Sequence, residues 1–310
     1  MPRADSLYIL AAGHSGSTLL NLILGSHSRA VAVSELTNLP VNIARNEVCT
    51  CGQALHDCAF WRAVAAQIES QRGIDILEEP TRFDLGYIDA PRGPYRGPPA
   101  YRAAWKLRRI ALYASIVTGV PLPAFMRHRF DRGMRNRLAL YDAVRAVSGA
   151  SVVVDASKEY LQGVTLQRWR PTQAQLILLV RDGRAVFYSN LKRGFGRAVS
   201  LDSWLNYWRN TLAVVTAGAD PARVRTLHYE NLAADPEKQV RAVCDFAGLD
   251  YEPGMLDIGS KQHHVTSGNN MRFNKSGIRL DTKWREELAA ADLAFFEKHA
   301  GALNRRLGYE

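Results

Sequence analysis

The sequence is poor in the features that mark secreted and membrane proteins. It has only four cysteines in 310 residues, too few for the disulfide framework of a small secreted domain. No apolar run approaches the roughly 18 residues that a membrane-spanning helix needs. The N-terminus passes directly into an apolar segment without the charged and apolar parts of a signal peptide. We therefore expect a soluble, cytosolic protein with no membrane span.

Acidic residues are also in the minority. Asp and Glu number 30 against 40 Lys and Arg, which gives a formal net charge of +10. This charge suits an anionic ligand, but it equally suits nucleic acid. Because the sequence shows no recognised nucleic-acid motif, a protein that binds nucleic acid or another polyanion stays an alternative only, and we expect no nucleic-acid partner.

The pattern of apolar residues indicates the fold class. With 47% hydrophobic residues, the chain can bury a full core as one large domain over residues 1–310. Apolar runs alternate with helical patterns, which favours an α/β fold with a doubly wound, parallel central sheet. The runs expected to be strands are 7–10, 29–36, 151–155, 175–180 and 224–229.

One long segment interrupts this alternation. Residues 58–72, 100–118 and 124–147 have the spacing of helices. Residues 73–99 between them are rich in Pro, Gly, Asp and Tyr, which is typical of a long mobile loop. We interpret residues from about 41–150 as a helical and loop insertion within the single domain.

The stretch from Ala11 to Leu20 reads AAGHSGSTLL and follows the first apolar run. Gly13 and Gly16 permit a tight turn, and Ser17 and Thr18 stand where a helix would begin. Free backbone N–H groups and hydroxyls would then point at one spot, which suits a phosphate or sulfate. The loop is not a Walker A loop, because only two residues separate the glycines and no lysine precedes Thr18. An ordinary serine-capped corner is the competing interpretation.

A second motif begins at Arg181, which ends the apolar run 175–180. Ser189 follows eight residues later in a predicted helix. An arginine at a strand end and a serine in the next helix can bracket one phosphate, the arginine through charge-assisted hydrogen bonds and the serine through its hydroxyl. Taken alone, Arg181 beside Asp182 is more commonly a structural ion pair.

A carboxylate stands near the end of the expected strand 29–36. The ends of parallel strands converge on the ligand crevice, so Glu35 can face a site there. An acidic residue at the start of a helix, or a plain surface charge, is the equally strong alternative from the residues alone.

Three of the four cysteines lie within ten positions. Cys49, Cys51, His56 and Cys58 could form a tetrahedral zinc site, although their spacing is not that of a standard finger or ribbon. We favour reduced thiols packed in a tight turn and assign no metal. Oxidation of Cys51 with Cys58 during purification is a further alternative.

The first loop resembles the 5′-phosphosulfate loop of sulfotransferases that use 3′-phosphoadenosine 5′-phosphosulfate (PAPS), whose pattern is Lys/Arg-Ser-Gly-Thr/Ser-Thr-Leu. The second motif resembles the 3′-phosphate motif of the same family, with Arg181 and Ser189 at the matching positions. His14 replaces the basic residue of the loop pattern, so imidazolium or a lysine from elsewhere could meet the charge at the bridging oxygen. The resemblance implies a P-loop-like, three-layer fold.

Other segments resemble the tyrosylprotein and carbohydrate sulfotransferase branch and bacterial members of the family. In the tyrosylprotein branch a glutamate at the position of Glu35 acts as the general base, and a lysine at the position of Lys158 reaches the transferring sulfuryl group. The segments around Tyr229 and Arg272 resemble a strand-to-helix segment and a C-terminal cofactor loop of bacterial members. The resemblance covers nearly the whole chain except residues 59–150.

This resemblance implies in-line transfer of a sulfuryl group from PAPS to a hydroxyl or amine, with adenosine 3′,5′-bisphosphate (PAP) as the product and no metal required. The implied catalytic residues are Glu35, His14 and Lys158. The implied cofactor-binding residues are Gly13, His14, Ser15, Gly16, Ser17, Thr18, Leu19, Arg181, Ser189, Tyr229 and Arg272. We expect bound sulfate and phosphate to raise the pKa of His14 and keep it protonated, which leaves Glu35 as the base.

The acceptor and the oligomeric state stay open at this point. A small molecule, a carbohydrate, a lipid or a peptide could accept the group, because the insertion at about 41–150 would shape the acceptor pocket. A P-loop small-molecule kinase is the rival enzyme, since it would have the same fold. That rival requires a Walker lysine, which this sequence lacks.

Overall fold

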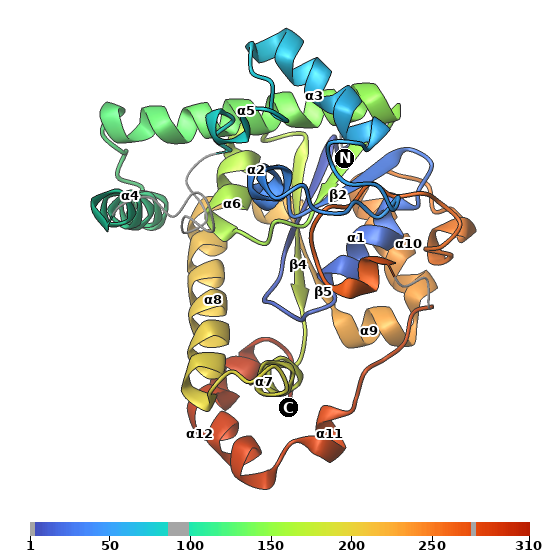
Figure 1. The fold of residues 1–310 in the computed structure, drawn as a ribbon. Helices are drawn as coiled ribbons and strands as arrows, with labels where there is room; N and C mark the ends of the chain where they lie inside the picture. Colours follow the sequence, from blue (N-terminus) through green and yellow to red (C-terminus); the bar gives the residue numbers. More distant parts are fainter. Residues whose placement is uncertain (1–3, 86–98, 274–276) are drawn as a thin grey trace.

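The computed structural model describes residues 4–85, 99–273 and 277–310. Within these ranges, five parallel strands form one sheet in the order β2-β3-β1-β4-β5 (Figure 1). The strands are β1 (Ser6–Leu10), β2 (Ala30–Ser34), β3 (Val152–Asp155), β4 (Ala174–Val180) and β5 (Val224–His228). The prediction of a parallel central sheet is confirmed.

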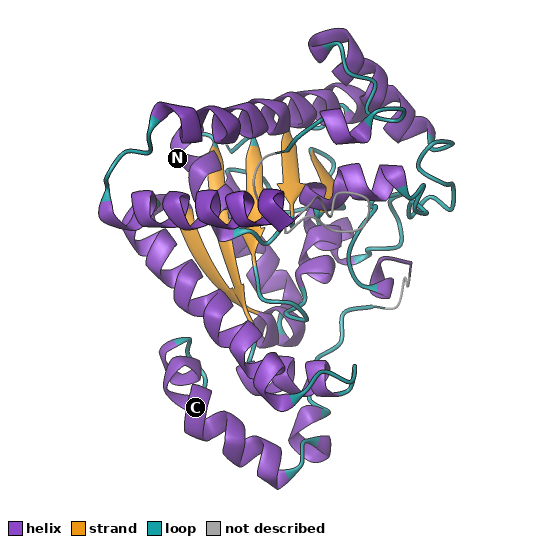
Figure 2. Ribbon diagram, turned by 60° about the vertical axis from the view of Figure 1, so that its left-hand side comes forward, coloured by secondary structure: helices purple, strands orange, loops and turns teal. Residues whose placement is uncertain are grey.

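The central strand β1 shows why the domain has three layers. Successive side chains of a strand point to opposite faces. Leu7 and Ile9 enter one hydrophobic core, while Tyr8 and Leu10 enter the other. A parallel sheet that is apolar on both faces must be covered on both, and Figure 2 shows helices on either side of the strands. The predicted three-layer α/β fold is therefore confirmed.

Each face of the sheet has its own set of helices. The core around Leu7 and Ile9 is closed by α1 (Ser17–Gly25), α9 (Tyr229–Ala234) and α10 (Pro236–Ala247). The core around Tyr8 and Leu10 is closed by α3 (Ala59–Arg72), α4 (Pro99–Thr118), α5 (Ala124–Ser148), α6 (Tyr160–Trp169), α7 (Gly183–Leu191), α8 (Arg197–Gly218) and α12 (Ala290–Arg306). None of the helices in the described ranges combines the length and the apolar character that crossing a bilayer requires.

Shorter elements complete the chain. Two are brief α-helices, α2 (Leu39–Ala44) and α11 (Trp284–Glu287). The 3-10 helices are η1 (Leu36–Asn38), η2 (Pro80–Arg82), η4 (Pro221–Arg223), η5 (Pro253–Leu256) and η6 (Asn270–Phe273).

The described part of the segment between β2 and β3 contains three long helices. The helices expected at 58–72, 100–118 and 124–147 correspond to α3, α4 and α5. Of the mobile loop expected at 73–99, residues 86–98 lie outside the described residues. The interpretation of this segment as an insertion that shapes an acceptor pocket stays a prediction.

The last strand ends earlier than its sequence pattern predicted. We expected a strand over 224–229, but β5 ends at His228 and Tyr229 begins α9. The reason is tertiary, because the Tyr229 ring packs against the turn at Gly16 and its hydroxyl donates to the carbonyl of Arg279 at 3.1 Å.

A buried ion pair lies beneath the carboxyl end of β3. The guanidinium of Arg137 in α5 donates to the carboxylate of Asp155, and both side chains are fully buried. Tyr141 donates to the same carboxylate at 2.7 Å. Burial by itself would lower the pKa of Arg137, but the neighbouring Asp155 carboxylate raises it above its ordinary value. Arg137 is therefore charged, and its bond to Asp155 anchors α5 to the sheet.

We predict that removing the cation of this pair destabilises the fold. Arg137→Met should lower the free energy of unfolding by about 3–5 kcal/mol, because Asp155 would keep a buried charge without its partner. Urea unfolding followed by circular dichroism measures the loss. Arg127→Met on the same helix is the matched control, since Arg127 is exposed and pairs with the half-buried Asp131. This variant should cost less than about 1 kcal/mol. Equal losses for both variants would contradict the prediction.

Candidate active site

The turn between β1 and α1 has the backbone of an anion-binding loop. His14 and Gly16 both adopt left-handed conformations, with φ of 63° and 84°. At Gly16 only glycine fits, because a Cβ there would lie 2.4 Å from the ring of Tyr229. Helix α1 begins at Ser17 without a side-chain cap, so its first N–H groups face the turn. The buried hydroxyl of Ser15 has no hydrogen-bond partner among the described residues.

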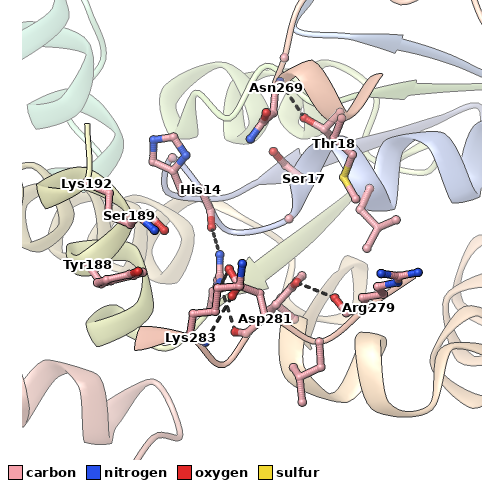
Figure 3. Close-up of a pocket in the computed structure, with 18 of the residues that line it drawn as sticks. His14, Ser17, Thr18, Tyr188, Ser189, Lys192, Asn269, Arg279, Asp281 and Lys283 are labelled. Atoms are coloured by element: carbon pink, nitrogen blue, oxygen red, sulfur yellow. Dashed lines mark hydrogen bonds and ion pairs between the residues drawn. The ribbon is translucent and has the colours of Figure 1, made fainter. Parts of the chain in front are cut away.

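A cleft of about 1010 Å³ opens at this turn, which is large enough for a nucleotide-sized ligand. It lies at the carboxyl ends of the strands, where β1 and β4 lead to opposite halves of the sheet, the usual ligand position in such folds. Figure 3 shows side chains of the turn, of α7 and of residues 279–283 around one space. The predicted site residues that line it are Gly13, His14, Gly16, Ser17, Thr18, Leu19, Glu35, Lys158, Arg181, Ser189 and Tyr229.

Two predicted residues do not line the cleft. Ser15 is fully buried within the turn. Arg272 donates to the carbonyl of Gly268 at 3.0 Å, and its guanidinium lies over the ring of Phe273. Arg272 is therefore held beside the cleft by its own loop.

Arg181, at the end of β4, joins three parts of the site. Its guanidinium donates to the carbonyl of His14 at 2.8 Å and to the carboxylate of Asp281 at 3.0 Å. It also lies 4.6 Å from the centre of the Tyr229 ring. Its buried Nε has no partner within the described residues. The structural pair with Asp182 is not formed by Arg181, because Asp182 instead pairs with Arg184 at 2.8 Å.

Ser189 reaches the same cleft from α7. Its hydroxyl donates to the carbonyl of Ala185, one turn earlier, at 2.9 Å. The hydroxyl oxygen can still accept a hydrogen bond, and the hydroxyl can rotate toward a ligand in the cleft. Arg181 and Ser189, eight residues apart, thus line one cavity, as the phosphate-bracketing interpretation requires.

Glu35 and Lys158 meet across the ends of β2 and β3. The ammonium of Lys158 lies 2.5 Å from Oε1 of Glu35, and Asn38 donates to Oε2 at 2.9 Å. Lys158 and Ser34, the residue before Glu35, have φ of 67° and 58°. Such left-handed backbone costs energy in residues other than glycine and is often found at functional sites. The pairing could not be read from the sequence, because 123 positions separate the two residues.

Without bound anions, the protein's own groups set the charge state of His14. Burial, followed by the positive charges of Arg193, Lys158 and Arg181, lowers the pKa of His14 to about 4. The protein's own groups therefore keep this imidazole neutral near pH 7. Our expectation of a protonated His14 depended on bound anions, which act in the opposite direction.

Four cationic residues that no motif marked also line the cleft. They are Lys192, Arg193, Arg279 and Lys283. Lys192 and Arg193 directly follow α7, while Arg279 and Lys283 belong to the segment before α11 (Figure 3). The Lys-Arg pair soon after Ser189 was the available signal for the first two. Because all four side chains are positively charged, they make the cleft attractive to polyanions.

The loop expected at 268–272 lies against α1. Gly268 has φ of 114°, and a Cβ there would lie 2.9 Å from the hydroxyl of Thr18. The backbone N–H of Asn269 donates to the same hydroxyl at 3.3 Å. Glycine is required here both by the backbone and by the close approach, and Gly268 and Asn269 line the cleft.

A second cleft, of about 720 Å³, opens on the other side of His14. Gly13 and His14 border both clefts. The second cleft contains the ion pair of Arg109 with Glu159, at 2.9 Å, and Arg109 also donates to Tyr160 at 2.9 Å. Arg109 comes from α4, so the segment between β2 and β3 contributes to this wall.

The chain is similar to known proteins in both sequence and fold. The family model described as "Sulfotransferase family" matches residues 122–253. The sulfotransferase domain from the olefin synthase of Synechococcus PCC 7002 is 19% identical, with a TM-score of 0.55 over 100% of this chain and 97% of that one. A sulfotransferase domain from the curacin biosynthetic pathway is 17% identical, with a TM-score of 0.51 over 100% of this chain and 99% of that one.

At these identities the structural likeness concerns the fold alone. None of the curated protein sequences compared with the chain matches it. The matched model includes the segment of Arg181 and Ser189, which line the main cleft. The kinase and the polyanion-binding protein are not favoured by any of these matches. The chain thus matches the sulfotransferase family model over residues 122–253, and its fold is similar to that of sulfotransferase domains.

Proposed function

We propose that this protein transfers a sulfuryl group from PAPS to a hydroxyl or amine of an acceptor that reaches the main cleft from the second cleft. The observation that supports it most is the convergence on one cleft of the β1–α1 turn, the Arg181 and Ser189 pair, and the ion pair of Glu35 with Lys158. A phosphate cradle alone would suit many ligands, whereas a carboxylate and a lysine beside it suit group transfer.

The residues of the cleft fit the two anionic ends of PAPS. The N–H groups at the start of α1 and the hydroxyls of Ser17 and Thr18 would hold the 5′-phosphate. Arg181 and Ser189 would hold the 3′-phosphate, and the buried Arg181 Nε without a partner among the described residues is a donor suited to that role. When bound, PAPS supplies the sulfuryl group and its phosphate leaving group.

Lys158 would stabilise charge as the transfer proceeds. Its ammonium already touches Glu35 at 2.5 Å. A sulfuryl group in the cleft would compete with the carboxylate for this ammonium. The competition weakens the hold on Oε1 of Glu35 and makes that oxygen a better proton acceptor. Lys158 would thus serve both the transferring group and the activation of the base.

Glu35 is our candidate for the general base, and His14 is the alternative. The carboxylate of Glu35 is oriented from both oxygens by Lys158 and Asn38. His14 borders both clefts, and its lowered pKa makes it neutral and able to accept a proton. Anions bound beside His14 would raise its pKa and convert it into a donor to the leaving oxygen. We therefore assign the proton transfer from the acceptor to Glu35.

The proposed donor can be tested against the rival ligands by thermal shift. PAP should raise the melting temperature, because a ligand that binds the native state stabilises it. ATP with magnesium and single-stranded DNA should have much smaller effects at the same concentration. Formation of labelled product from labelled PAPS and an acceptor panel would complete the test. Stabilisation by ATP with magnesium or by DNA, but not by PAP, would contradict the proposal.

Discrimination of the 3′-phosphate should depend on Arg181 and Ser189. Arg181→Ala should lose about 1.5–3 kcal/mol of the preference for PAP over AMP, the value of a hydrogen bond to a charged group. Because Arg181 also holds the His14 carbonyl, Ser189→Ala is the milder second variant, with a loss in the same direction. Ser203→Ala in the second cleft is the matched control and should leave the preference intact. Calorimetry of both ligands gives the ratio, and an unchanged ratio in Arg181→Ala and Ser189→Ala would reject the assignment.

Separate variants should distinguish the roles of Glu35 and His14. Glu35→Gln should lower turnover by at least about a hundredfold, with the affinity for PAP within a few fold, because only the proton acceptor is lost. His14→Gln should weaken PAP affinity and turnover together. Glu252→Gln, whose carboxylate accepts from the N–H of Ser28 at 2.8 Å outside both clefts, is the control.

Proton uptake provides a second measure of His14. If bound anions raise its pKa from about 4, PAP binding near pH 6 should take up protons, as calorimetry in buffers of different ionisation enthalpy would record. The uptake should shrink in His14→Gln.

Near-normal turnover of Glu35→Gln with saturating acceptor would mean that Glu35 is not the base.

A further inference from the structure

Four metal-ligating side chains converge outside both clefts. Cys49, Cys51 and Cys58 come from the turn before α3, and His264 comes from the segment that follows η5. One ligand atom from each side chain lies within 4.8 Å of the other three. The sulfurs of Cys51 and Cys58 are 3.6 Å apart, and Nδ1 of His264 is 3.4 Å from Cys58 Sγ and 3.8 Å from Cys49 Sγ.

These separations are those of ligands around one tetrahedral ion. With Zn–S near 2.3 Å and Zn–N near 2.0–2.1 Å, tetrahedral geometry places neighbouring ligand atoms about 3.5–3.8 Å apart. A disulfide would require two sulfurs at about 2.05 Å and would leave the other two groups without a role. The arrangement therefore matches a three-cysteine, one-histidine site better than a bond between two cysteines.

The backbone of the turn presents the first two sulfurs. Gly52 has φ of 90°, and its N–H donates to the carbonyl of Cys49 at 2.9 Å. An isolated antiparallel bridge joins Val48 to Ala54 on either side. Cys58 is the residue before α3, so the start of a helix fixes the third sulfur.

His264 is oriented independently of the cysteines. Its ring stacks on Phe60, with centroids 4.6 Å apart, and its carbonyl accepts from the indole of Trp61 at 3.0 Å. Thr50, between the first two cysteines, donates its N–H to Val265 at 3.1 Å. These contacts aim Nδ1 at the sulfurs, as outer contacts do for histidine ligands of metals.

The fourth ligand differs from the one considered in the sequence. We named His56 with the three cysteines, but its Nε2 lies 3.1 Å from the carbonyl of Ile43 and it does not join the cluster. His264 is the fourth member of the cluster instead, although it follows Cys58 by 206 positions in the sequence. Our assignment of no metal was made without this residue.

We propose that Cys49, Cys51, Cys58 and His264 bind one zinc ion in a closed structural site. The thiols coordinate as thiolates, so binding releases the protons that they carry. With four protein ligands the ion has no open position and does no chemistry on a substrate. It links the start of α3 to the segment 257–273.

This link reaches the main cleft through short contacts. Ser267, three residues after His264, accepts from Ser34 at 2.6 Å through its carbonyl, and Asn269 donates to Thr18 at 3.3 Å. The zinc ion would thus help to fix the loop 268–272 against α1. The proposal does not depend on the identity of the donor or acceptor.

Metal content of the full chain, purified under reducing conditions, tests the site. Elemental analysis should find about one zinc per chain, and Cys51→Ser and His264→Ala should each lower it at least about fivefold. Cys244→Ala and His56→Ala are the controls that should keep the zinc. Cys244 contacts Met255 in the core around Leu7 and Ile9, and His56 lies outside the cluster. Removal of zinc by a chelator should lower the melting temperature of the unaltered protein and not that of His264→Ala.

Cobalt provides a second measurement on the unaltered chain. Cobalt(II) added to the chelated protein should give the absorption of a tetrahedral site together with thiolate charge-transfer bands, and zinc should remove both. A folded chain that stays metal-free after exposure to zinc and gives no such cobalt spectrum would overturn the proposal. A disulfide between Cys51 and Cys58 in freshly purified, reduced protein would also overturn it.

Discussion

The buried ion pair of Arg137 with Asp155 is the constraint on which one wall of the main cleft depends. Buried charges need partners inside the protein, and two of the partners of this pair are close to the site. Asp155 accepts from the N–H of Ser157 at 2.8 Å, next to Lys158, and Arg137 donates to Thr37 at 3.0 Å, two residues after Glu35. The hydrogen bonds of the buried pair thus hold the backbone near Ser157 and Thr37, and so position Lys158 and Glu35 for their contact.

That anchorage also explains where the backbone is strained. Apart from glycines, the described residues with positive φ are His14, Ser34, Asn46 and Lys158, and all but Asn46 belong to the cleft or stand beside one of its residues. Conformations of this kind each cost about 1–3 kcal/mol and persist only where the surroundings dictate them. The Asp155 network and the Arg181 bond to the His14 carbonyl supply that support.

The sequence predicted most of the secondary structure and the short motifs, but few of the contacts between distant segments. Period and composition were sufficient for the five strands and for α3, α4 and α5, because each pattern lies within one continuous segment of the chain. The turn at Gly16 and the Arg181 motif lay within short segments and could be recognised. The bond of Glu35 with Lys158 and the approach of His264 to the cysteines join distant segments, so no local pattern could report them.

Histidine at position 14 gives the proposed chemistry a dependence on its own substrate. A lysine or arginine, as in the family pattern that the loop resembles, would be charged at all times. Burial, followed by the positive charges around His14, instead lowers its pKa to about 4, so the imidazole is neutral until anions enter the cleft. Bound phosphate and sulfate would oppose the effect of these positive charges and favour the imidazolium. On the proposed function, the charge that stabilises the leaving oxygen therefore forms only when the donor that needs it is bound.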